Sequence, residues 1–183
     1  MEGDLDSNLK QNHWKHYYEN GILKNEGAYV NSLKEGNWKY YRENGSFKAE
    51  AEFSNNEGIY IEYFEDGNIK MTGKIIDGKS TGFWKYYYPN GTIKAEGNES
   101  NGIKNDLWLF YYESGELKSK GNYSNGVTTG KWSYFHKNGQ LEATGNLEGD
   151  EKTGYWNMFF PTGEEKAKAN YTAPDAKYTE YYE

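Results

Sequence analysis

Residues 82–97 read GFWKYYYPNGTIKAEG, and this stretch decides the fold because it recurs along the chain. An aromatic-rich run leads into the pair Asn90-Gly91, and a run that ends in glycine follows it. Asn-Gly between two such runs is the strongest short signal for a β-hairpin, because a type I′ turn needs positive φ at both central residues. The stretch therefore predicts a hairpin with a two-residue type I′ turn.

The hairpin recurs with a period close to 24 residues. Its turn glycine is found in seven copies, at Gly21, Gly45, Gly67, Gly91, Gly115, Gly139 and Gly163. Seven positions before each of them stands a large ring, at Trp14, Trp38, Tyr60, Trp84, Trp108, Trp132 and Trp156. These positions hold all 6 Trp of the chain. Self-similarity at a fixed period marks a repeat architecture, with these rings as its expected core.

A second turn signal, as at Asp77-Gly78 and Asn101-Gly102, joins consecutive hairpins. The fold class is therefore all-β, an elongated antiparallel meander of about eight consecutive hairpins in an open sheet that curls or coils. The limits expected for this single array, residues 1–183, are a half repeat at 1–11, repeats at 12–35, 36–57, 58–81, 82–105, 106–129, 130–153 and 154–175, and a half repeat at 176–183. The half repeats leave open whether the chain is a piece of a longer array.

The turn also predicts which residues face each other across a hairpin. With a two-residue turn at Asn20-Gly21, the pairs on one face are Tyr18 with Leu23, His16 with Asn25, and Trp14 with Gly27. We expect each Trp to lie over the glycine opposite it, so that this face is the packing core. On the other face the pairs are Tyr17 with Lys24 and Lys15 with Glu26.

A row of rings on the second face is the candidate partner-binding surface. Its members are Tyr17, Tyr41, Tyr63, Tyr87, Tyr111, Phe135 and Phe159. Beside it we expect a row of lysines, Lys24, Lys48, Lys70, Lys94 and Lys118. One interpretation is that the rings only close a second packing layer or stack on the lysine stems. The other is a ladder that gives a protein partner a large contact area at low entropic cost.

Composition excludes several classes of protein. A net charge of −7 and a mean hydropathy of −1.11 would fit a disordered chain, but 6 Trp, 19 Tyr and 8 Phe supply a core of rings. The acidic charge argues against nucleic acid and against anionic lipid as partners, because both attract clustered positive charge. Without Cys there is no disulfide and no thiolate metal site. No apolar run is long enough to span a membrane.

The sequence contains no recognisable catalytic or metal-binding constellation. Its three histidines, His13, His16 and His136, are scattered, and His136 takes a position that holds Tyr in sister repeats. The run Asp77-Gly78-Lys79-Ser80 lacks the Gly-x-x-x-x-Gly-Lys frame of a phosphate-binding loop. We therefore expect no enzyme activity, no cofactor and no metal.

The signature Gly-x-Trp-x-Tyr-Tyr-x-x-Asn-Gly-x-x-Lys-x-Glu-Gly, intact over residues 82–97, resembles the MORN-repeat variant family of bacteria. The resemblance covers essentially the whole chain, with departures at Tyr60, at Glu165, and at a loop around Asn55-Asn56 that is two residues short. It implies an elongated antiparallel sheet of hairpins that serves as an interaction module. Some members are labelled antitoxins or immunity proteins and others exported repeat proteins, while eukaryotic relatives are scaffolds with proposed phospholipid binding.

Three functions follow, in descending order of support. The first is a non-catalytic module for protein–protein interaction, an antitoxin or immunity partner whose acidic charge suits a basic protein. The second is an exported or cell-surface repeat protein that acts as a spacer or adhesin. The third is a phospholipid-associating scaffold, against which the net charge of −7 weighs. Unprotected edge strands would also permit end-to-end self-association.

The compartment depends on the native amino terminus. Read from Met1, the sequence has no basic and apolar leader, so the cytoplasm is expected. A signal peptide upstream of Met1 would mean export instead.

Overall fold

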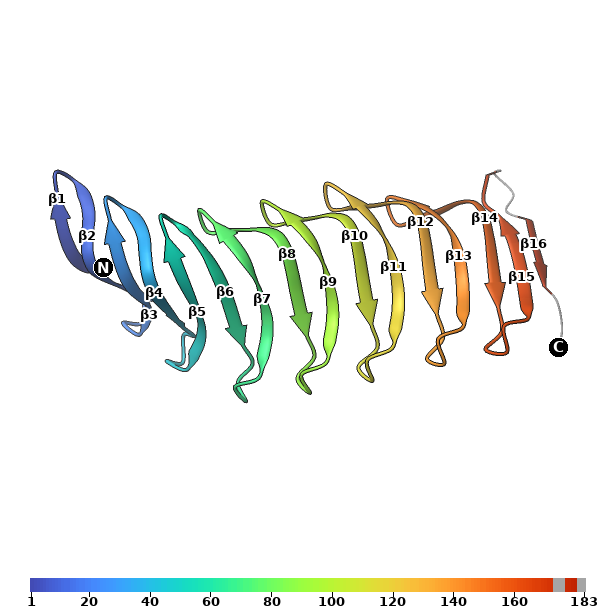
Figure 1. The fold of residues 1–183 in the computed structure, drawn as a ribbon, viewed down its shortest axis with the longest axis horizontal. Coiled ribbons are helices and arrows are strands. Elements are labelled where there is room, and N and C mark those ends of the chain that lie inside the picture. Colours follow the sequence, from blue (N-terminus) through green and yellow to red (C-terminus); the bar gives the residue numbers. More distant parts are fainter. Residues whose placement is uncertain (173–176, 181–183) are drawn as a thin grey trace. The chain divides into compact units, whose positions relative to one another are not determined.

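The computed structural model describes residues 1–172 and 177–180, and all its regular structure is β-strand (Figure 1). The chain forms two compact units, residues 1–91 and 92–183. The first contains β1 (Glu2–Asp6), β2 (Leu9–Tyr17), β3 (Leu23–Val30), β4 (Leu33–Tyr41), β5 (Phe47–Ser54), β6 (Glu57–Tyr63), β7 (Ile69–Ile76) and β8 (Lys79–Tyr87). The second contains β9 (Ile93–Ser100), β10 (Ile103–Tyr111), β11 (Leu117–Ser124), β12 (Val127–Phe135), β13 (Leu141–Glu148), β14 (Glu151–Phe159), β15 (Glu165–Asn170) and β16 (Lys177–Glu180).

Within each unit every strand pairs antiparallel with its neighbours in chain order. The predicted all-β meander of consecutive hairpins is confirmed. Parts of two predicted segments lie outside the described residues, namely 173–175 of repeat 154–175, and 176 and 181–183 of half repeat 176–183. The strands form because their sequences alternate, as in β5, where Ala49, Ala51 and Phe53 are buried and the Glu residues between them are exposed.

The turns that follow β1, β3, β5, β7, β9, β11 and β13 have the two-residue type I′ form. Between β7 and β8, Asp77 has φ 51° and Gly78 has φ 76°, and Ile76 pairs directly with Lys79. The left-handed region favours Gly and short polar residues that bond locally. Accordingly, the central pairs of these turns are Ser7-Asn8, Asn31-Ser32, Asn55-Asn56, Asp77-Gly78, Asn101-Gly102, Asn125-Gly126 and Gly149-Asp150.

The Asn20-Gly21 turn differs from its prediction. Gly21 has φ 82°, but Asn20 is not in the positive-φ region. Gly21 N donates to Tyr18 O at 3.0 Å and Tyr18 N donates to Ile22 O at 2.8 Å, which closes a three-residue loop, a type I turn followed by a bulge glycine. Asn20 Oδ1 accepts a hydrogen bond from Ile22 N at 3.0 Å. This local bond favours the type I form, so the predicted two-residue type I′ turn is wrong.

The same loop recurs in later hairpins. The turn glycine donates to the carbonyl three residues before it at Gly45, Gly67, Gly91, Gly115, Gly139 and Gly163. The residue before the glycine accepts the same kind of side-chain bond at Asn44, Asp66, Asn138 and Thr162. A short side-chain acceptor at this position is therefore what the loop requires.

The extra loop residue shifts the pairing beside the turn by one position. Tyr17 faces Leu23, so the predicted pairs of Tyr17 with Lys24 and of Tyr18 with Leu23 are wrong. Farther from the turn the predicted pairs are confirmed, namely Trp14 with Gly27, His16 with Asn25, and Lys15 with Glu26.

The core of each unit is formed by tryptophans on one face of its sheet. In the first unit the buried cluster contains Trp14, Tyr29, Trp38, Ala51, Phe53, Ile75 and Trp84. In the second it contains Trp132, Leu147, Trp156 and Ala169, and Trp108 is also fully buried. We call this side of each sheet the tryptophan face.

Each indole lies over a glycine of the preceding strand. A Cβ added to Gly27 would lie 2.3 Å from the Trp38 ring, and a Cβ added to Gly3 would lie 2.3 Å from the Trp14 ring. The prediction that Trp14 covers Gly27 is therefore wrong, although the two residues are paired in register. The other glycine–indole contacts are Gly73 with Trp84, Gly97 with Trp108, Gly121 with Trp132, and Gly145 with Trp156.

A bulge next to each Trp accounts for the direction of the indole. Gly36, two residues before Trp38, has φ 63°, and the pairing of β3 with β4 shifts between Glu26 and Ala28. Because the bulge interrupts the ladder, Ala28 O accepts a hydrogen bond from Trp38 Nε1 at 3.0 Å. The equivalent bonds join Trp14 to Asp4 O, Trp84 to Lys74 O, Trp108 to Asn98 O, and Trp156 to Asn146 O.

The hairpin that contains Tyr60 departs from this pattern in several respects at once. Ala51 stands where β3 has Gly27, β5 and β6 pair without a register shift, and β6 has 7 residues where β4 has 9. The turn at Asn55-Asn56 keeps two residues, with φ 52° and 69°. The two missing residues therefore belong to the strand, and the predicted short loop is wrong. Since the Ala51 methyl occupies the space of an indole, the smaller ring of Tyr60 replaces Trp.

Candidate functional site

The ring row lies on the face opposite the tryptophans, because residues three apart in a strand, such as Trp14 and Tyr17, point to opposite sides. In the first unit Tyr17, Tyr41 and Tyr63 face Leu23, Phe47 and Ile69. In the second unit Tyr111, Phe135 and Phe159 face Leu117, Leu141 and Glu165. The rings are half-buried, while Phe47 and Ile69 are each 40% exposed. In the first unit the row is thus an apolar stripe partly open to solvent.

The hydroxyls of the ring row are bound to carboxylates of the preceding strand. Tyr41 donates to Glu26 Oε1 at 3.1 Å and Tyr63 donates to Glu50 Oε1 at 2.6 Å. The bond to Glu50, together with burial, raises the pKa of Tyr63 to about 12. The same arrangement joins Tyr17 to Glu2 at 3.0 Å and Tyr111 to Glu96 at 2.7 Å. These phenols therefore stay protonated at neutral pH, and both ends of each ring are fixed.

At Phe135 the type of ring matches the residue beside it on the preceding strand. At Phe135 the glutamate position is held by Lys120, whose Nζ lies 5.8 Å from the centre of the ring. A phenol there would have no carboxylate to donate to, and a plain ring offers the ammonium a cation–π contact instead. At Phe135, a contact within the chain thus accounts for Phe in place of Tyr.

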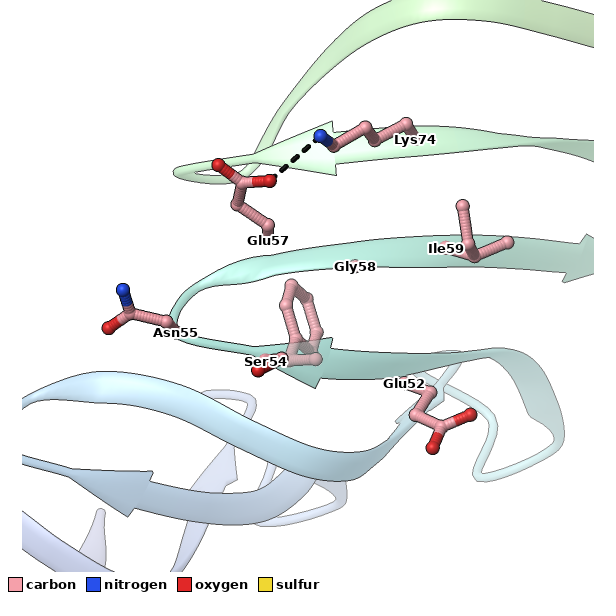
Figure 2. A pocket seen from close by; sticks show the side chains of 8 residues that line it. Glu52, Ser54, Asn55, Glu57, Gly58, Ile59 and Lys74 are labelled. Carbon is pink, nitrogen blue, oxygen red and sulfur yellow. Dashed lines mark ion pairs between the residues drawn. The ribbon is translucent and has the colours of Figure 1, made fainter.

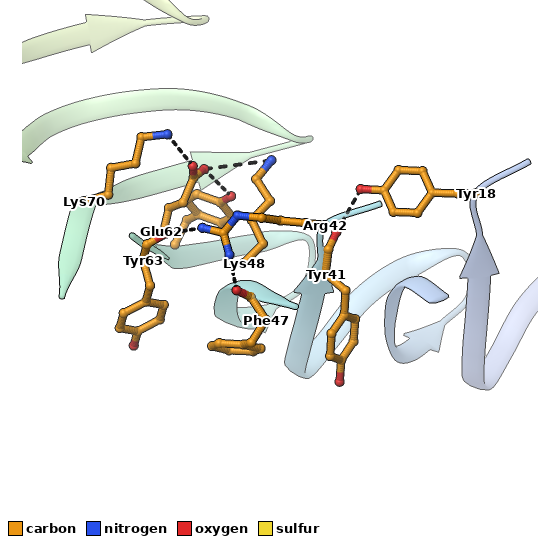
Figure 3. A network of polar contacts seen from close by, with 9 residues as sticks. Tyr18, Tyr41, Arg42, Phe47, Lys48, Glu62, Tyr63 and Lys70 are labelled. Carbon is orange, nitrogen blue, oxygen red and sulfur yellow. Dashed lines mark hydrogen bonds and ion pairs between the residues drawn. The ribbon is translucent and has the colours of Figure 1, made fainter. Parts of the chain in front are cut away.

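The predicted lysine row does not follow the rings. Lys24 Nζ lies 5.3 Å from the Tyr18 ring, and Lys118 Nζ lies 5.7 Å from the Tyr112 ring. Lys70 Nζ lies 2.8 Å from Glu62 and Lys48 Nζ lies 4.0 Å from it. Figure 3 shows the Lys48, Lys70 and Glu62 side chains gathered on one side of the sheet and the Tyr41, Tyr63 and Phe47 rings on the other. The expected flanking position is therefore wrong for Lys48 and Lys70, because the loop bulge changes which residue faces each ring. Lys94 is an exposed residue of β9.

Glu62 is a buried carboxylate at a position that holds Tyr40 in the preceding repeat. It is 5% exposed, and its partners are Tyr60, which donates to Oε2 at 3.0 Å, and Lys70 at 2.8 Å. Burial alone would raise the pKa of Glu62, but the bonds from Lys70 and Tyr60 hold this pKa below its usual value. The charge is thus compensated where the regular repeat would have a ring.

A set of lysines on the tryptophan face escaped the sequence reasoning. Each stands four residues before a Trp, with Nζ over the indole, at Lys10, Lys34, Lys104 and Lys152. Lys34 Nζ lies 4.4 Å from the Trp38 ring, 5.0 Å from the Phe53 ring and 3.0 Å from the Tyr40 hydroxyl. The recurrence of Lys at this fixed distance from Trp was the signal available in the sequence. Cation–π contact explains its position.

The stability contributed by Lys34 should depend on pH. Burial, and to a lesser degree the charge of Lys10, lowers the pKa of Lys34 to about 8, whereas an unfolded lysine titrates near about 10.4. Between these values the unfolded chain binds more protons at this residue, so its contribution to the free energy of unfolding rises with pH. Urea unfolding of wild type and of Lys34→Met at pH 7 and at about pH 9.5 tests this. The free energy of unfolding of wild type, relative to that of the variant, should be larger at the higher pH. A constant difference would contradict this.

Each of the three histidines has its own separate contacts. His136 Nε2 lies 2.9 Å from Phe159 O, the bond that Tyr18 makes to Tyr41 O at 2.8 Å. His16 packs among Trp14, Tyr29 and Trp38, and His13 lies 3.3 Å from Glu26. In residues 1–172 and 177–180 no group of three or more His, Asp or Glu could hold a metal ion.

A hollow of about 590 Å³ opens at the β5–β6 hairpin (Figure 2). It is lined by Glu52, Phe53, Ser54, Asn55, Glu57, Gly58, Ile59 and Lys74. Lys74 Nζ and Glu57 Oε2 are 2.7 Å apart and neutralise each other. The remaining charged group in the lining is Glu52.

Comparisons with known proteins agree with the repeat architecture. The family model described as MORN repeat variant matches six segments, residues 10–31, 34–55, 56–75, 81–98, 107–125 and 128–148. Such repeats indicate a module for protein or membrane interaction. No curated protein shows significant similarity to the chain. In the described part of the chain there is no helix suited to crossing a membrane.

Solved structures match only weakly. A crystal structure of S. aureus TarM is 15% identical with a TM-score of 0.27, over 64% of this chain and 20% of that one. TcdB2-TccC3 is 13% identical with a TM-score of 0.21, over 97% and 12%. The Photorhabdus luminescens Tc holotoxin pore is 12% identical with a TM-score of 0.21, over 91% and 11%. The chain thus spans a fifth or less of these solved chains, and the likeness carries no argument about function.

Proposed function

Since the chain belongs to the MORN repeat variant family, we propose that it is a non-catalytic module that binds a protein partner through the ring row. The finer proposal is a one-to-one complex in which the chain acts as an antitoxin or immunity protein toward its target. The observation that carries the proposal is a row of rings, half open to solvent, that recurs at the same position of successive hairpins.

The rigidity of the rings supports this function. Tyr41 and Tyr63 both contact Phe47, with ring centres 6.0 Å and 5.7 Å apart, and their hydroxyls are held by Glu26 and Glu50. A side chain that is already ordered loses little conformational entropy when a partner binds. Aromatic residues held in this way are typical anchors of protein interfaces.

The charge around the row supports a particular kind of partner. The carboxylates that hold the rings leave negative groups beside an apolar stripe, and the whole chain has a net charge of −7. A partner with an apolar centre bordered by Lys and Arg would be complementary in both respects. The non-catalytic part of the proposal rests on the histidines, which are each occupied in packing or in a single bond.

The test is affinity capture from a lysate of the source organism, followed by calorimetry with the purified partner. Replacing Tyr41 and Tyr63 by Ala should weaken binding by at least about tenfold per ring, the size expected for interface anchors. Tyr155→Ala is the matched control, because this ring is 73% exposed and lies outside the row. Both variants must unfold cooperatively, so that a loss of binding is not a loss of folding.

Two outcomes would contradict the proposal. A folded double variant that binds its partner as wild type does would remove the ring row as the interface. Binding to anionic vesicles at low salt, with no protein retained, would favour the lipid-associating alternative.

A further inference from the structure

The regular repeats close the tryptophan face with a lysine, and one place in the first unit has none. Lys10 and Lys34 lie over Trp14 and Trp38. The shortened strand β6 lacks the two residues that would include this position, and the equivalent position before Trp84 is Ser80, which is too short to cover a ring. Neither Tyr60 nor Trp84 therefore has a lysine at this position of its repeat.

A hollow of about 420 Å³ lies at this place. It is lined by Lys34, Tyr40, Lys48, Tyr60, Met71, Ile75, Gly78, Ser80 and Trp84. Its volume is within the range of small-molecule sites, about 300–1,000 Å³. It lies on the tryptophan face, so it is separate from the ring row and independent of the proposed function.

The charge of the lining is positive. Two amines face the hollow, and none of its lining residues is Asp or Glu. Among the described residues no carboxylate lies within ion-pair distance of Lys34, whose Nζ is 3.0 Å from the Tyr40 hydroxyl. Lys48 Nζ lies 4.0 Å from Glu62, which is at the limit of an ion pair, and Lys70 already binds that carboxylate at 2.8 Å. An unpaired, half-buried ammonium favours an anion as its partner.

The other side of the hollow is aromatic. The Tyr40 and Tyr60 ring centres are 5.7 Å apart at 72°, and those of Tyr60 and Trp84 are 6.4 Å apart at 41°. Met71 and Ile75 complete this apolar wall. Such a wall accommodates a flat apolar body by offset or edge-on contact.

From these two sides we infer that the hollow binds a small organic carboxylate with a planar apolar body. The carboxylate accepts hydrogen bonds from Lys34 and the Tyr40 hydroxyl, and the ring of the ligand packs against Tyr60 and Trp84. The same chemistry could be offered by a free aryl acid or by the carboxyl-terminal aromatic residue of a peptide.

The experiment is an NMR titration of the whole chain with phenylacetate, with the Trp84 indole N–H as the reporter. Saturable shifts are expected, and the isosteric but uncharged phenylacetamide should bind at least tenfold more weakly. An acetylated tripeptide ending in Phe distinguishes a chain terminus from a free acid: tighter binding than phenylacetate assigns the site to a terminus, and weaker binding assigns it to a free acid. Absence of saturable shifts with both acids, or equal binding of acid and amide, would overturn the inference.

Variants locate the site. Lys34→Met should weaken phenylacetate binding at least tenfold, and Lys34→Arg should retain it. Lys104→Met is the matched control, because Lys104 Nζ lies 4.6 Å over Trp108 at the same position of a repeat in the other unit. Normal binding by a folded Lys34→Met variant would overturn the assignment. If that variant does not fold, the comparison of phenylacetate with phenylacetamide on wild type still decides whether a charge is recognised.

Discussion

Replacing Trp84 by Ala should lower the free energy of unfolding by about 3–5 kcal/mol, the usual cost of emptying a core position of this size. The indole is 3% exposed, packs in the cluster of the first unit, and donates to Lys74 O at 3.1 Å. The variant loses the buried ring and leaves that carbonyl without its donor. Urea unfolding of the whole chain, followed by tryptophan fluorescence and circular dichroism, measures the loss.

Phe83 provides the matched control for Trp84. It is the preceding residue on the same strand, but its side chain points to the opposite face and is 52% exposed. Phe83→Ala should change stability by less than about 0.5 kcal/mol, the range of ordinary surface substitutions. Equal losses for the two variants would mean that the tryptophan face is not the main source of stability.

Replacing Gly73 by Ala should destabilise the chain by about 1–3 kcal/mol or more, although it adds a single methyl group. The new Cβ would lie 2.3 Å from the Trp84 ring. The φ of Gly73 is not in the positive region, so the cost arises from overlap with the indole and not from backbone strain. Thermal and urea unfolding would measure it, and a loss below about 0.5 kcal/mol would mean that the ring moves aside freely.

The Tyr60 hairpin suggests how this cost can be relieved. There Ala51 pairs with Tyr60, so the double variant Gly73→Ala, Trp84→Tyr reproduces a combination that the chain already contains. Its loss should be smaller than the sum of the two single losses, with a coupling of about 0.5–3 kcal/mol for residues in contact. Simple additivity would contradict the view that the indole requires glycine because of space.

The sequence predicted the strands and their order because the signal repeats. One ring and one turn glycine in every copy identify the hairpins, and the pairs of Trp14 with Gly27 and Lys15 with Glu26 follow from their spacing. The turn type could not be derived in the same way, since Asn-Gly is compatible with both a two-residue and a three-residue loop. The choice is reinforced by a contact distant in sequence, the bond from Asn20 Nδ2 to Glu43 O at 3.2 Å.

The direction of each indole was also beyond the sequence pattern. Trp14 has a glycine on either side, Gly3 on the preceding strand and Gly27 on the following strand, and the pattern alone does not distinguish them. The bulge at Asn12, with φ 58°, sets the choice, and a bulge is visible only when the register is known.

The candidate site was predicted in part. The ring positions lie on one face because they share a strand position. The lysines were assigned to that face because a two-residue turn was assumed, and the three-residue loop shifts the pairing beside it by one residue. Residues four apart in a regular strand share a face but lie about 13 Å apart. The contact of Lys34 with Trp38 was therefore not expected, because it depends on the bulge between them.

The Tyr60 hairpin has a consequence for how a partner finds its place. A strictly periodic surface has translational symmetry, so a long partner could bind it in several offset positions of equal energy. On the ring-row face the seven-residue strand β6 breaks that symmetry, because it places Ile59 and Ile61 opposite Glu52 and Glu50, where β4 has Asn37 and Lys39. An offset of one repeat would bring the partner against different residues at this hairpin. The hairpin therefore distinguishes one register of the partner from all the others.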